Sequence, residues 1–500
     1  MMGNGSMVVV IGICVYAVFI LGLGLFKKTD GKNFVNAGGG IGSFALVCSM
    51  FISIFSGLFF FGTPAAYFRE GMGVLAGTGG CVAAFMSGLC GYRLWLLGKK
   101  YGYLTPSNFL RKRYYSDGYG MFVSIILVVF IVPYAALQMV AIGNGIALGT
   151  KGVISFELAV VVATVVITVQ LLSGGMKSVA WLDVFHLFLG VGALVIFVVY
   201  LIATYFPDGG LAAAVAQVTS DPKTNALLYF PGPNGYFDWR GTLDYSLAGA
   251  ISTFVWPHIF MRCYLAKDTT NFRSMPKYMP LIYVIAMFFI GLIGTVIAPA
   301  ILGGDFADSD NIVPYLASEY CPPFITLLVT LCVFAFAEST TSSMLMSCST
   351  MASRDLYLYP KYVSKGKKPD ERKGTLFARL VLVVLMIAMI IIAVNKPVFI
   401  VDFAYKLSSP FFAMILPETI GGLYWKRGSK QGAWAGTVGG MAVVTLFTFF
   451  VTPPLGLSAV VWGVLVNLVL YVAVSLMTNV PQKIVDTYIT PVEKRCSAGE

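Results

Sequence analysis

Long apolar runs separated by short polar segments fill this chain from end to end. A helix needs roughly 20 apolar residues to cross the hydrocarbon core of a bilayer, and runs of that length recur between Met7 and Met477. Following each run to the Gly, Pro or charged residues that break it predicts thirteen membrane-spanning helices. The predicted spans are 6–26, 42–68, 73–97, 119–148, 152–174, 181–205, 244–265, 278–302, 313–350, 376–395, 398–424, 433–452 and 456–478. The pattern therefore predicts an all-α integral membrane protein without a soluble domain.

Two of these spans are interrupted by polar and helix-breaking residues in matching positions. Span 42–68 contains Ser53-Ile54-Phe55-Ser56-Gly57, and span 244–265 contains Gly249-Ala250-Ile251-Ser252-Thr253 followed by Trp256-Pro257. A broken helix frees backbone amides and carbonyls, which membrane proteins tolerate only where those groups line a cavity or are buried in protein. Paired breaks in two inverted halves are typical of transporters with a binding site near the membrane midplane. The alternative is that both are ordinary helix kinks.

The paired breaks divide the chain into two five-helix units. The first predicted repeat covers 42–205 and the second covers 244–424. Each unit has an odd number of spans, so the two insert with opposite topology. Span 6–26 is then an extra N-terminal helix, and 433–478 holds two extra C-terminal helices. We expect residues 1–500 to form one membrane transport domain.

The composition excludes several classes of protein. Hydrophobic residues make up 58% of the chain and charged residues only 11%, whereas soluble domains average about 25% charged residues. Soluble enzymes, nucleic-acid binders and disordered scaffolds are therefore poor interpretations. The two histidines, His186 and His258, and the nine cysteines show no metal-binding or disulfide spacing. We accordingly expect no enzyme, because a membrane-embedded enzyme would need a metal cluster or a nucleophile–base pair.

The distribution of basic residues predicts the orientation in the membrane. If the N-terminus lies outside, 28 of the 34 lysines and arginines fall at the inner ends of the spans and in the inner loops. The outer segment 304–310 instead carries three aspartates. Positive residues concentrate on the cytoplasmic side of membrane proteins. We therefore predict a multi-pass protein of the cell membrane with its N-terminus outside and its C-terminus in the cytoplasm. The net charge of +11 therefore reflects the membrane topology and does not indicate nucleic-acid binding.

A run of hydroxyl side chains follows an acid within span 313–350. It reads Glu338-Ser339-Thr340-Thr341-Ser342-Ser343. At 100° per residue, Ser339, Ser342 and Ser343 share one face of a helix. Hydroxyl and carbonyl oxygens suit small hard cations, so the run indicates a cation site. The alternative is that these hydroxyls bond the carbonyls four residues earlier and help the helices pack.

Other polar residues inside the spans are candidates for ion or solute binding. Asp183 near the start of span 181–205 could receive a cation, or it could be an acid favoured by the helix dipole at an N-terminus. Gln138 in span 119–148 could donate a hydrogen bond to a solute. The candidate solute-binding residues at the breaks and beside them are Ser53, Ser56, Gly57, Gln138, Thr253 and Trp256.

Several segments in this order resemble the sodium/solute symporter family over nearly the whole chain. The segments that carry the resemblance are Thr105-Pro106-Ser107-Asn108-Phe109-Leu110-Arg111-Lys112-Arg113-Tyr114, the stretch from Gly174 to Asp183, Trp256-Pro257-His258 with Arg262, the hydroxyl run with Arg354-Asp355-Leu356-Tyr357, and Leu423-Tyr424-Trp425-Lys426-Arg427-Gly428. The resemblance implies the inverted-repeat fold of leucine-transporter-like proteins. It also implies uptake of a solute coupled to inward sodium movement.

The resemblance further implies two sodium sites. The first would use backbone carbonyls of Ile52, Phe55 and Phe336 and the hydroxyls of Ser339 and Thr340. Some family members hold a second sodium ion, which maps to Ser339, Ser342, Ser343 and Asp183. All four of these positions carry oxygen-bearing side chains, so we predict the second site as well.

The chain also departs from the family pattern. Phe336 replaces a small residue, Glu338 an apolar residue, and His186 a frequent glutamine. Proline-transporting relatives carry an acid at position 54, where this chain has Ile54, so proline is a weaker solute candidate. The Trp256-Pro257-His258 stretch looks most like relatives that carry small organic acids.

We therefore expect a sodium-coupled symporter for a monocarboxylate or pantothenate-like acid that works by alternating access. The alternatives are an amino acid or sugar symporter, a passive channel, or a membrane-embedded enzyme. The expected partners are the solute, sodium ions and the lipid bilayer, without nucleic acid, and one chain is the expected functional unit.

Overall fold

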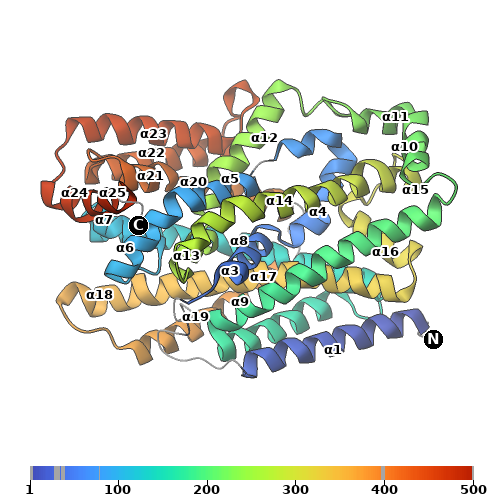
Figure 1. The fold of residues 1–500 in the computed structure, drawn as a ribbon, viewed down its shortest axis with the longest axis horizontal. Coiled ribbons are helices and arrows are strands. Elements are labelled where there is room, and N and C mark those ends of the chain that lie inside the picture. Colours follow the sequence, from blue (N-terminus) through green and yellow to red (C-terminus); the bar gives the residue numbers. More distant parts are fainter. Residues whose placement is uncertain (1–3, 27–33, 35–39, 78, 396–399, 498–500) are drawn as a thin grey trace.

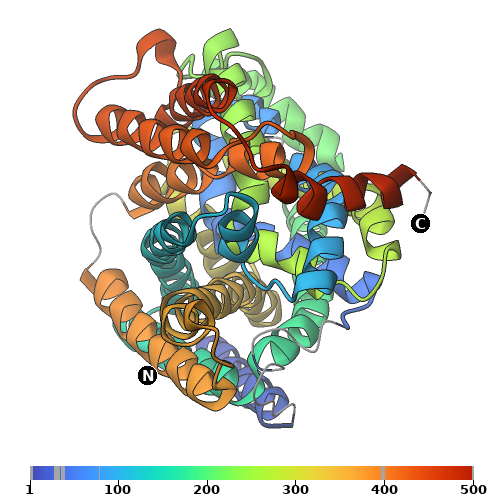
Figure 2. The same ribbon diagram turned by 90° about the vertical axis from the view of Figure 1, so that its left-hand side faces the viewer.

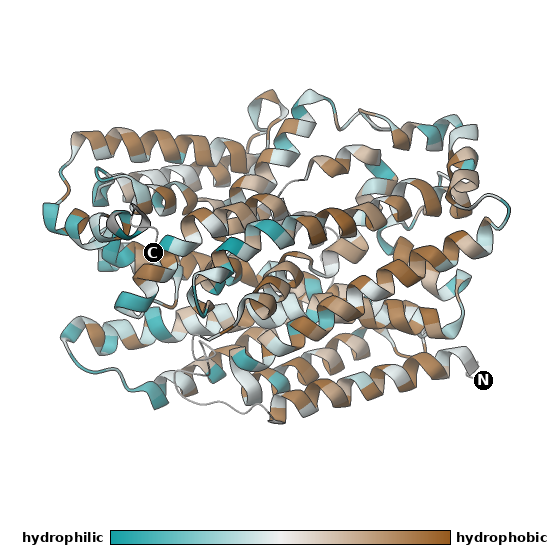
Figure 3. Cartoon of the chain, in the orientation of Figure 1, coloured by the Kyte–Doolittle hydropathy of each residue, from teal (hydrophilic) through white to brown (hydrophobic). Residues whose placement is uncertain are grey.

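The computed structural model describes residues 4–26, 34, 40–77, 79–395 and 400–497. Every secondary-structure element in these ranges is helical, apart from one isolated parallel β-bridge between Ile41 and Ala266. The long helices run roughly side by side along the long axis of the molecule (Figure 1). Apolar residues predominate in the middle of these helices and polar residues gather at both ends (Figure 3). The prediction of an all-α membrane protein is confirmed.

The described residues contain nine helices that are long and apolar enough to cross a membrane, or ten if one bent pair counts as a single span. The expected number was thirteen. One reason for the difference is that α9 (Phe156–Tyr205) counts once, although it consists of two helices that meet at Gly175 and correspond to the predicted spans 152–174 and 181–205. Gly175 has a φ of 56° and a ψ of −156° at this junction. The two ends of α9 lie close to the same segment, because the Tyr205 hydroxyl donates to the Tyr320 carbonyl at 2.9 Å and Lys151, just before α9, pairs with Glu319 at 3.1 Å.

The second reason for the lower count is that two predicted spans are broken into short helices. Span 42–68 consists of α3 (Ser43–Ile54) and α4 (Gly57–Glu70). Span 244–265 consists of α12 (Trp239–Ser252), a 3-10 turn over Thr253–Val255, and α13 (Pro257–Leu265). Both breaks therefore lie within the residues that the Gly, Ser and Pro pattern singled out. Pro64, another helix-breaking residue of span 42–68, lies inside α4 and does not end it.

The remaining elements follow the predicted order. The principal helices are α1 (Asn4–Phe26), α5 (Gly79–Met86), α6 (Tyr92–Tyr101), α7 (Pro106–Arg113), α8 (Asp117–Gly149), α14 (Thr270–Leu292), α15 (Ala298–Leu302), α16 (Ile312–Tyr320), α17 (Pro323–Met351), α19 (Glu371–Asn395), α20 (Ile400–Ala413), α21 (Leu416–Tyr424), α22 (Lys430–Phe449) and α23 (Ala459–Met477). Predicted span 313–350 is thus two helices, α16 and α17. Predicted span 398–424 corresponds to α20 and α21, and its first two residues lie outside the described ranges.

Local chemistry explains where several of these helices begin. The Thr105 hydroxyl accepts the backbone N–H of Asn108 at 3.1 Å, and Pro106 occupies the first position of α7. Ser116 caps α8 in the same way by accepting the N–H of Tyr119 at 3.2 Å. A side-chain oxygen at the N-cap satisfies an amide that has no partner within the helix, and proline fits there because it has no N–H to lose.

Helix α17 lies in the core and α1 at the periphery. The most apolar 18-residue stretch of the α17 span is 78% buried, against 28% for α1. Viewed along the helices, α22 and α23 form one edge of the molecule, and α1 and α19 lie at the opposite edge (Figures 1 and 2). The outward face of α19 exposes Leu376, Leu380, Ile387 and Ile391, at the i, i+4, i+7 spacing of one helix face. Lipid is the environment that such an apolar face suits.

The ends of the two broken helices are joined by backbone hydrogen bonds. The N–H of Ile41, just before α3, donates to the carbonyl of Leu265 at the end of α13 at 3.2 Å. The N–H of Lys267 donates back to the carbonyl of Ile41 at 3.0 Å, and the Asn271 side chain donates to the same carbonyl at 3.2 Å. The start of α3 and the end of α13 are therefore tied together.

Candidate functional site: a polar centre beside the first helix break

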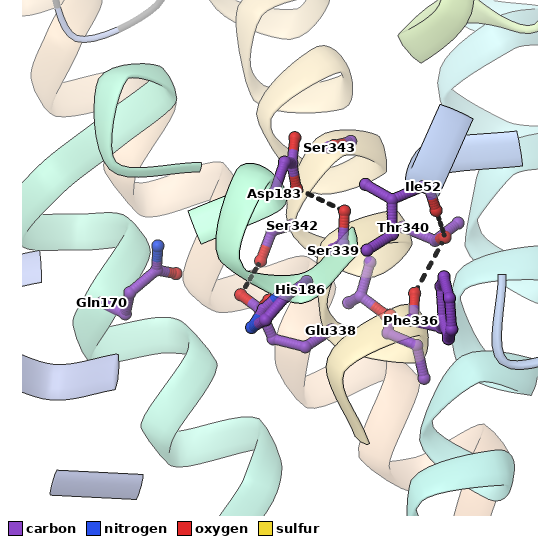
Figure 4. A network of polar contacts seen from close by, with 12 residues as sticks. Ile52, Gln170, Asp183, His186, Phe336, Glu338, Ser339, Thr340, Ser342 and Ser343 are labelled. Atoms are coloured by element: carbon purple, nitrogen blue, oxygen red, sulfur yellow. Dashed lines mark hydrogen bonds and ion pairs between the residues drawn. The ribbon is translucent and has the colours of Figure 1, made fainter. Parts of the chain in front are cut away.

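The Thr340 hydroxyl of α17 reaches the broken helix α3. It lies 3.4 Å from the Ile52 carbonyl oxygen and 3.1 Å from the Phe336 carbonyl oxygen (Figure 4). Phe55 is the residue at which α3 ends, with a φ of −76° and a ψ of 82°. Three of the five oxygens that the resemblance assigns to a first sodium site therefore converge on one point between α3 and α17. These are hard oxygen donors of the kind that small cations without d-electron preferences take.

Gly57 allows the helices around the break to approach closely. A Cβ atom at this position would lie 2.8 Å from the Cβ of Ala337 and 3.0 Å from the Cβ of Ala141. The Gly57 N–H, freed by the break, donates to the side-chain oxygen of Gln138 at 2.9 Å. The break is thus held between α8 and α17 by a backbone group that a continuous helix would have used internally.

A second group of oxygens gathers around Asp183. This residue is fully buried about two turns beyond the kink at Gly175, so it does not lie at the helix N-terminus that we considered as an alternative. Its Oδ1 accepts a short hydrogen bond from Ser339 of α17 (Figure 4). Its Oδ2 accepts one from Ser49 of α3. Asp183 therefore links α9 to both elements of the first candidate site.

The guanidinium of Arg262 enters this group from α13. Its Nη2 donates to Ser343 at 2.7 Å and to Ser53, and lies 3.4 Å from Asp183 Oδ2. Its Nε donates to Ser49 at 3.1 Å, and its Nη1 donates to the His258 carbonyl at 2.8 Å. Arg262 is one of the 28 basic residues at the inner ends of the predicted spans and in the inner loops. It is only 1% exposed and belongs to the polar centre.

Ser342 faces a different partner from Ser339 and Ser343. Its hydroxyl donates to Glu338 Oε1 at 2.7 Å, and Glu338 Oε2 lies 3.2 Å from His186 Nδ1 (Figure 4). The Tyr16 hydroxyl of α1 lies 2.6 Å from the other ring nitrogen of His186. Glu338 and His186, both departures from the family pattern, thus contact each other. All four of these residues are buried.

Part of the hydroxyl run follows the packing alternative. Thr341 donates to the Ala337 carbonyl at 2.7 Å, and Ser347, just beyond the run, donates to the Ser343 carbonyl at 2.8 Å. Both are bonds to the residue four positions earlier, the pattern expected when a hydroxyl only serves its own helix. Thr340 also bonds the carbonyl four positions earlier, but it reaches Ile52 of α3 as well. Ser339 bonds Asp183 of another helix.

The predicted solute-binding residues gather in part around the first break. The Ser56 hydroxyl lies 3.5 Å from the Tyr134 hydroxyl, and the Tyr134 and Trp256 rings lie 5.2 Å apart. Gln138 Nε2 and Trp256 Nε1 are buried N–H donors without a hydrogen-bond partner among the described residues. Two predicted residues are engaged elsewhere. Ser53 accepts from Arg262, and Thr253 donates to the Gly249 carbonyl of its own helix at 2.8 Å.

Five polar residues of this centre were assigned to no site from the sequence: Arg262, Ser49, Tyr16, and the two departures from the family pattern, Glu338 and His186. Arg262 carried a usable signal, because it lies inside the predicted span 244–265, and a charged residue within a membrane span is a functional candidate by default. Ser49 and Tyr16 are single hydroxyl residues in apolar helices, and their partners lie 134 and 170 positions away in the chain.

Two broken helices, a buried carboxylate and a cluster of hydroxyl and carbonyl oxygens define a multi-pass membrane protein with a candidate cation site. The family described as "Sodium:solute symporter family" matches residues 34–440 of this chain. The chain therefore belongs to the sodium:solute symporter family.

Similar proteins and structures agree with this assignment. A sodium/pantothenate symporter of Haemophilus influenzae is 24% identical, over 88% of this chain and 90% of its own length. The osmoregulated proline transporter OpuE of Bacillus subtilis is 24% identical, over 96% of both chains. The fold is similar to that of a sodium-coupled sialic acid symporter solved in a substrate-bound outward-open state, with a TM-score of 0.79 and 19% identity over 96% of this chain and 98% of the other.

Proposed function

We propose that this protein is a symporter that imports a small organic acid together with sodium by alternating access. The observation that carries the proposal is the position of Thr340. Its hydroxyl lies between the carbonyls of Ile52 and Phe336, so a cation bound there would join the broken helix α3 to the core helix α17.

Sodium binding at this point would couple to conformation. A ligand shifts the balance between two states only by its differential affinity for them. A cation that needs oxygens from both α3 and α17 binds only while the two elements are close. Sodium would therefore favour the state in which Ile52, Phe55, Phe336, Ser339 and Thr340 converge. Each positive charge that moves inward at −100 mV gains about 2.3 kcal/mol, which supplies energy for the uptake of the solute.

A second sodium ion would bind at Ser339, Ser342, Ser343 and Asp183. Two contacts support this site. Ser339 donates to Asp183, and the Ser343 hydroxyl lies 2.7 Å from Arg262 Nη2 and 3.3 Å from the Ser53 hydroxyl, beside the same carboxylate. The carboxylate supplies the negative charge that a buried cation needs. In this conformation Ser342 donates to Glu338, so its hydroxyl would turn toward Asp183 when it coordinates the ion.

The proposed solute is an organic acid because each break has an unused donor beside it. Gln138 Nε2 and Trp256 Nε1 are buried without partners, and a buried donor without a partner costs free energy. A carboxylate that reached both would accept from each and remove that cost. Ser53, Ser56, Gly57 and Thr253 are the other residues proposed to contact the solute. The similarity to a sodium/pantothenate symporter supports an acid.

The second candidate is an amino acid symporter, which the similarity to OpuE favours. An amino acid also presents a carboxylate, so the same two donors would serve it. The difference lies in the ammonium group, which needs an acceptor beside the break. Uptake of a panel of carboxylates, amino acids and sugars into proteoliposomes, with and without a sodium gradient, separates the two candidates.

Replacing Thr340 by alanine tests the first sodium site. The Thr340→Ala variant loses one oxygen ligand between α3 and α17, and hydrogen bonds to charged groups contribute about 1.5–3 kcal/mol. We therefore expect the sodium concentration for half-maximal uptake to rise about tenfold or more. Thr341→Ala is the matched control, because the Thr341 hydroxyl bonds only its own helix, and its sodium dependence should stay unchanged. Equal sodium dependence in both variants would contradict the site.

Counterflow distinguishes the carrier from a passive channel. Proteoliposomes preloaded with unlabelled solute should accumulate labelled solute transiently, because a carrier exchanges solutes through a saturable site. A channel would only equilibrate the label, and that result would refute alternating access.

A further inference from the structure

Arg262 reaches two residues of the proposed second sodium site. Its Nη2 donates to Ser343 at 2.7 Å and lies 3.4 Å from Asp183 Oδ2. The side chain of Arg262 is 2% exposed and that of Asp183 is 0% exposed. Two of the four side chains assigned to the second ion are therefore already in contact with a cation that belongs to the protein.

The contacts of Arg262 fall into two groups on different elements. Toward α3 and its own helix, the guanidinium donates to Ser49, Ser53 and the His258 carbonyl. Toward α17 and α9, it contacts Ser343 and Asp183. The first group fixes the guanidinium to the broken helices α3 and α13 through three hydrogen bonds. The second group connects it to α9 and α17, the helices that carry the proposed ion ligands.

We infer that Arg262 is an internal counter-ion that takes the place of the second sodium ion when that ion is absent. This inference rests on the proposed sodium coupling. A sodium ion bound to Ser343 and Asp183 would use the same oxygens that now face Nη2, and two positive charges this close repel strongly in a low-dielectric interior. Arg262 and the ion therefore exclude each other. Sodium binding would require the guanidinium to withdraw from Ser343 and Asp183.

This exchange would let the carrier return without sodium. Asp183 without a cation would be an unpaired buried charge, which is strongly destabilising. With Arg262 in contact, the empty carrier keeps its carboxylate paired during the return step. A variant without this charge should still exchange solute when sodium is present on both sides, but it should fail in net uptake, which needs the sodium-free return.

The test measures sodium binding by the stability of the purified protein. The melting temperature is recorded against sodium concentration for three proteins: the Thr340→Ala variant, in which the first site is weakened, and the same variant with Arg262→Gln or Arg262→Lys added. The native protein is measured alongside them. Because Arg262→Gln removes the competing charge, the sodium concentration at the midpoint of its stabilisation should fall by a factor of about ten or more. Lysine keeps the charge but lacks the planar fork, so Arg262→Lys should shift in the same direction by a smaller factor.

A second buried arginine–aspartate pair provides the control. Arg111 Nη1 lies 3.6 Å from Asp355 Oδ1, and their side chains are 1% and 0% exposed. The pair lies outside the residues assigned to sodium, so Arg111→Gln should lower the melting temperature without moving the sodium midpoint. This separates competition at the site from a general loss of stability.

The outcomes distinguish the inference from its premise. A lower sodium midpoint in the Arg262 variants, together with retained exchange and lost net uptake, supports the counter-ion. Unchanged sodium midpoints in the Arg262 variants overturn the counter-ion inference. If Arg262→Gln does not fold, the midpoint of Arg262→Lys is sufficient for this test. If sodium stabilises neither the native protein nor any variant, the proposed sodium coupling itself fails.

Discussion

One hydroxyl of the peripheral helix α1 takes part in the polar centre. Tyr16 lies 2.6 Å from His186, whose other ring nitrogen lies 3.2 Å from Glu338. Buried polar groups cost free energy unless they are hydrogen-bonded, so the tyrosine lowers the cost of placing an imidazole and a carboxyl group between α9 and α17. The N-terminal helix, which lies outside the predicted repeats, is therefore part of the structure that holds the site.

We predict that Tyr16→Phe destabilises the protein by about 1–3 kcal/mol, because it leaves a buried imidazole nitrogen without its partner. The measurement is the melting temperature of the purified protein. Tyr205→Phe is the control, since its hydroxyl donates to the Tyr320 carbonyl at 2.9 Å at an exposed position, where the expected change is below about 0.5 kcal/mol. Equal effects of the two substitutions would refute a structural role for Tyr16.

At the residue scale, the sequence predicted which residues supply oxygen atoms to the site better than it predicted which residues they contact. Thr340 was placed with Ile52 and Phe336 through the family resemblance, and the structure brings these three together. Arg262 was not assigned to a site, although it lies inside a predicted span. Its partners on other helices lie 79 to 213 positions away, and no local pattern encodes such pairings.

At the scale of the helix, Gly175 determines the path of α9. Its φ of 56° and ψ of −156° lie in a backbone region that is essentially restricted to glycine. Beyond the kink, α9 continues through Asp183 and His186. The direction of the second half, and with it the position of both side chains against α17, depends on this one residue.

Gly175→Ala should therefore lower the stability by about 1–3 kcal/mol and weaken sodium-dependent uptake, because the kink relaxes and Asp183 shifts. The same helix supplies a control in Gly192, where a Cβ would meet nothing within 4 Å. Gly192→Ala should be neutral or slightly stabilising, since alanine favours helix over glycine. Melting temperature and uptake are measured for both. A kink that tolerates alanine as well as position 192 does would contradict this account.

The breaks were predictable because their signal is local, whereas the number of spans was not. Proline at position 257 and glycine at position 57 interrupt a helix by their own backbone chemistry, and both breaks lie beside these residues. The Gly174-Gly175 pair likewise predicted a boundary, and two helices meet at Gly175. The number of spans was harder to predict, because each half of a broken helix is too short to cross a membrane alone.

For the whole molecule, the start of α1 and the C-terminal helix α25 (Thr490–Ser497) lie toward opposite ends of the long axis (Figure 1). The basic residues predict that the end with α25 is cytoplasmic. We therefore expect an epitope tag at the N-terminus to be accessible to antibody on intact cells and a tag at the C-terminus only after permeabilisation. The reverse pattern would invert the proposed orientation and the assignment of inner and outer loops.

The bridge between Ile41 and Ala266 has a mechanical consequence. It fastens the start of α3 to the end of α13, and Arg262 links the same two helices through Ser49 and Ser53. Because they are attached at two separate points, these half-helices are expected to move as one rigid body. Movement against α9 and α17 must then break the contacts of Arg262 with Ser343 and Asp183 while its contacts with α3 travel along unchanged. The hinge of the molecule is therefore to be sought at Phe55 and Trp256, where the two half-helices end.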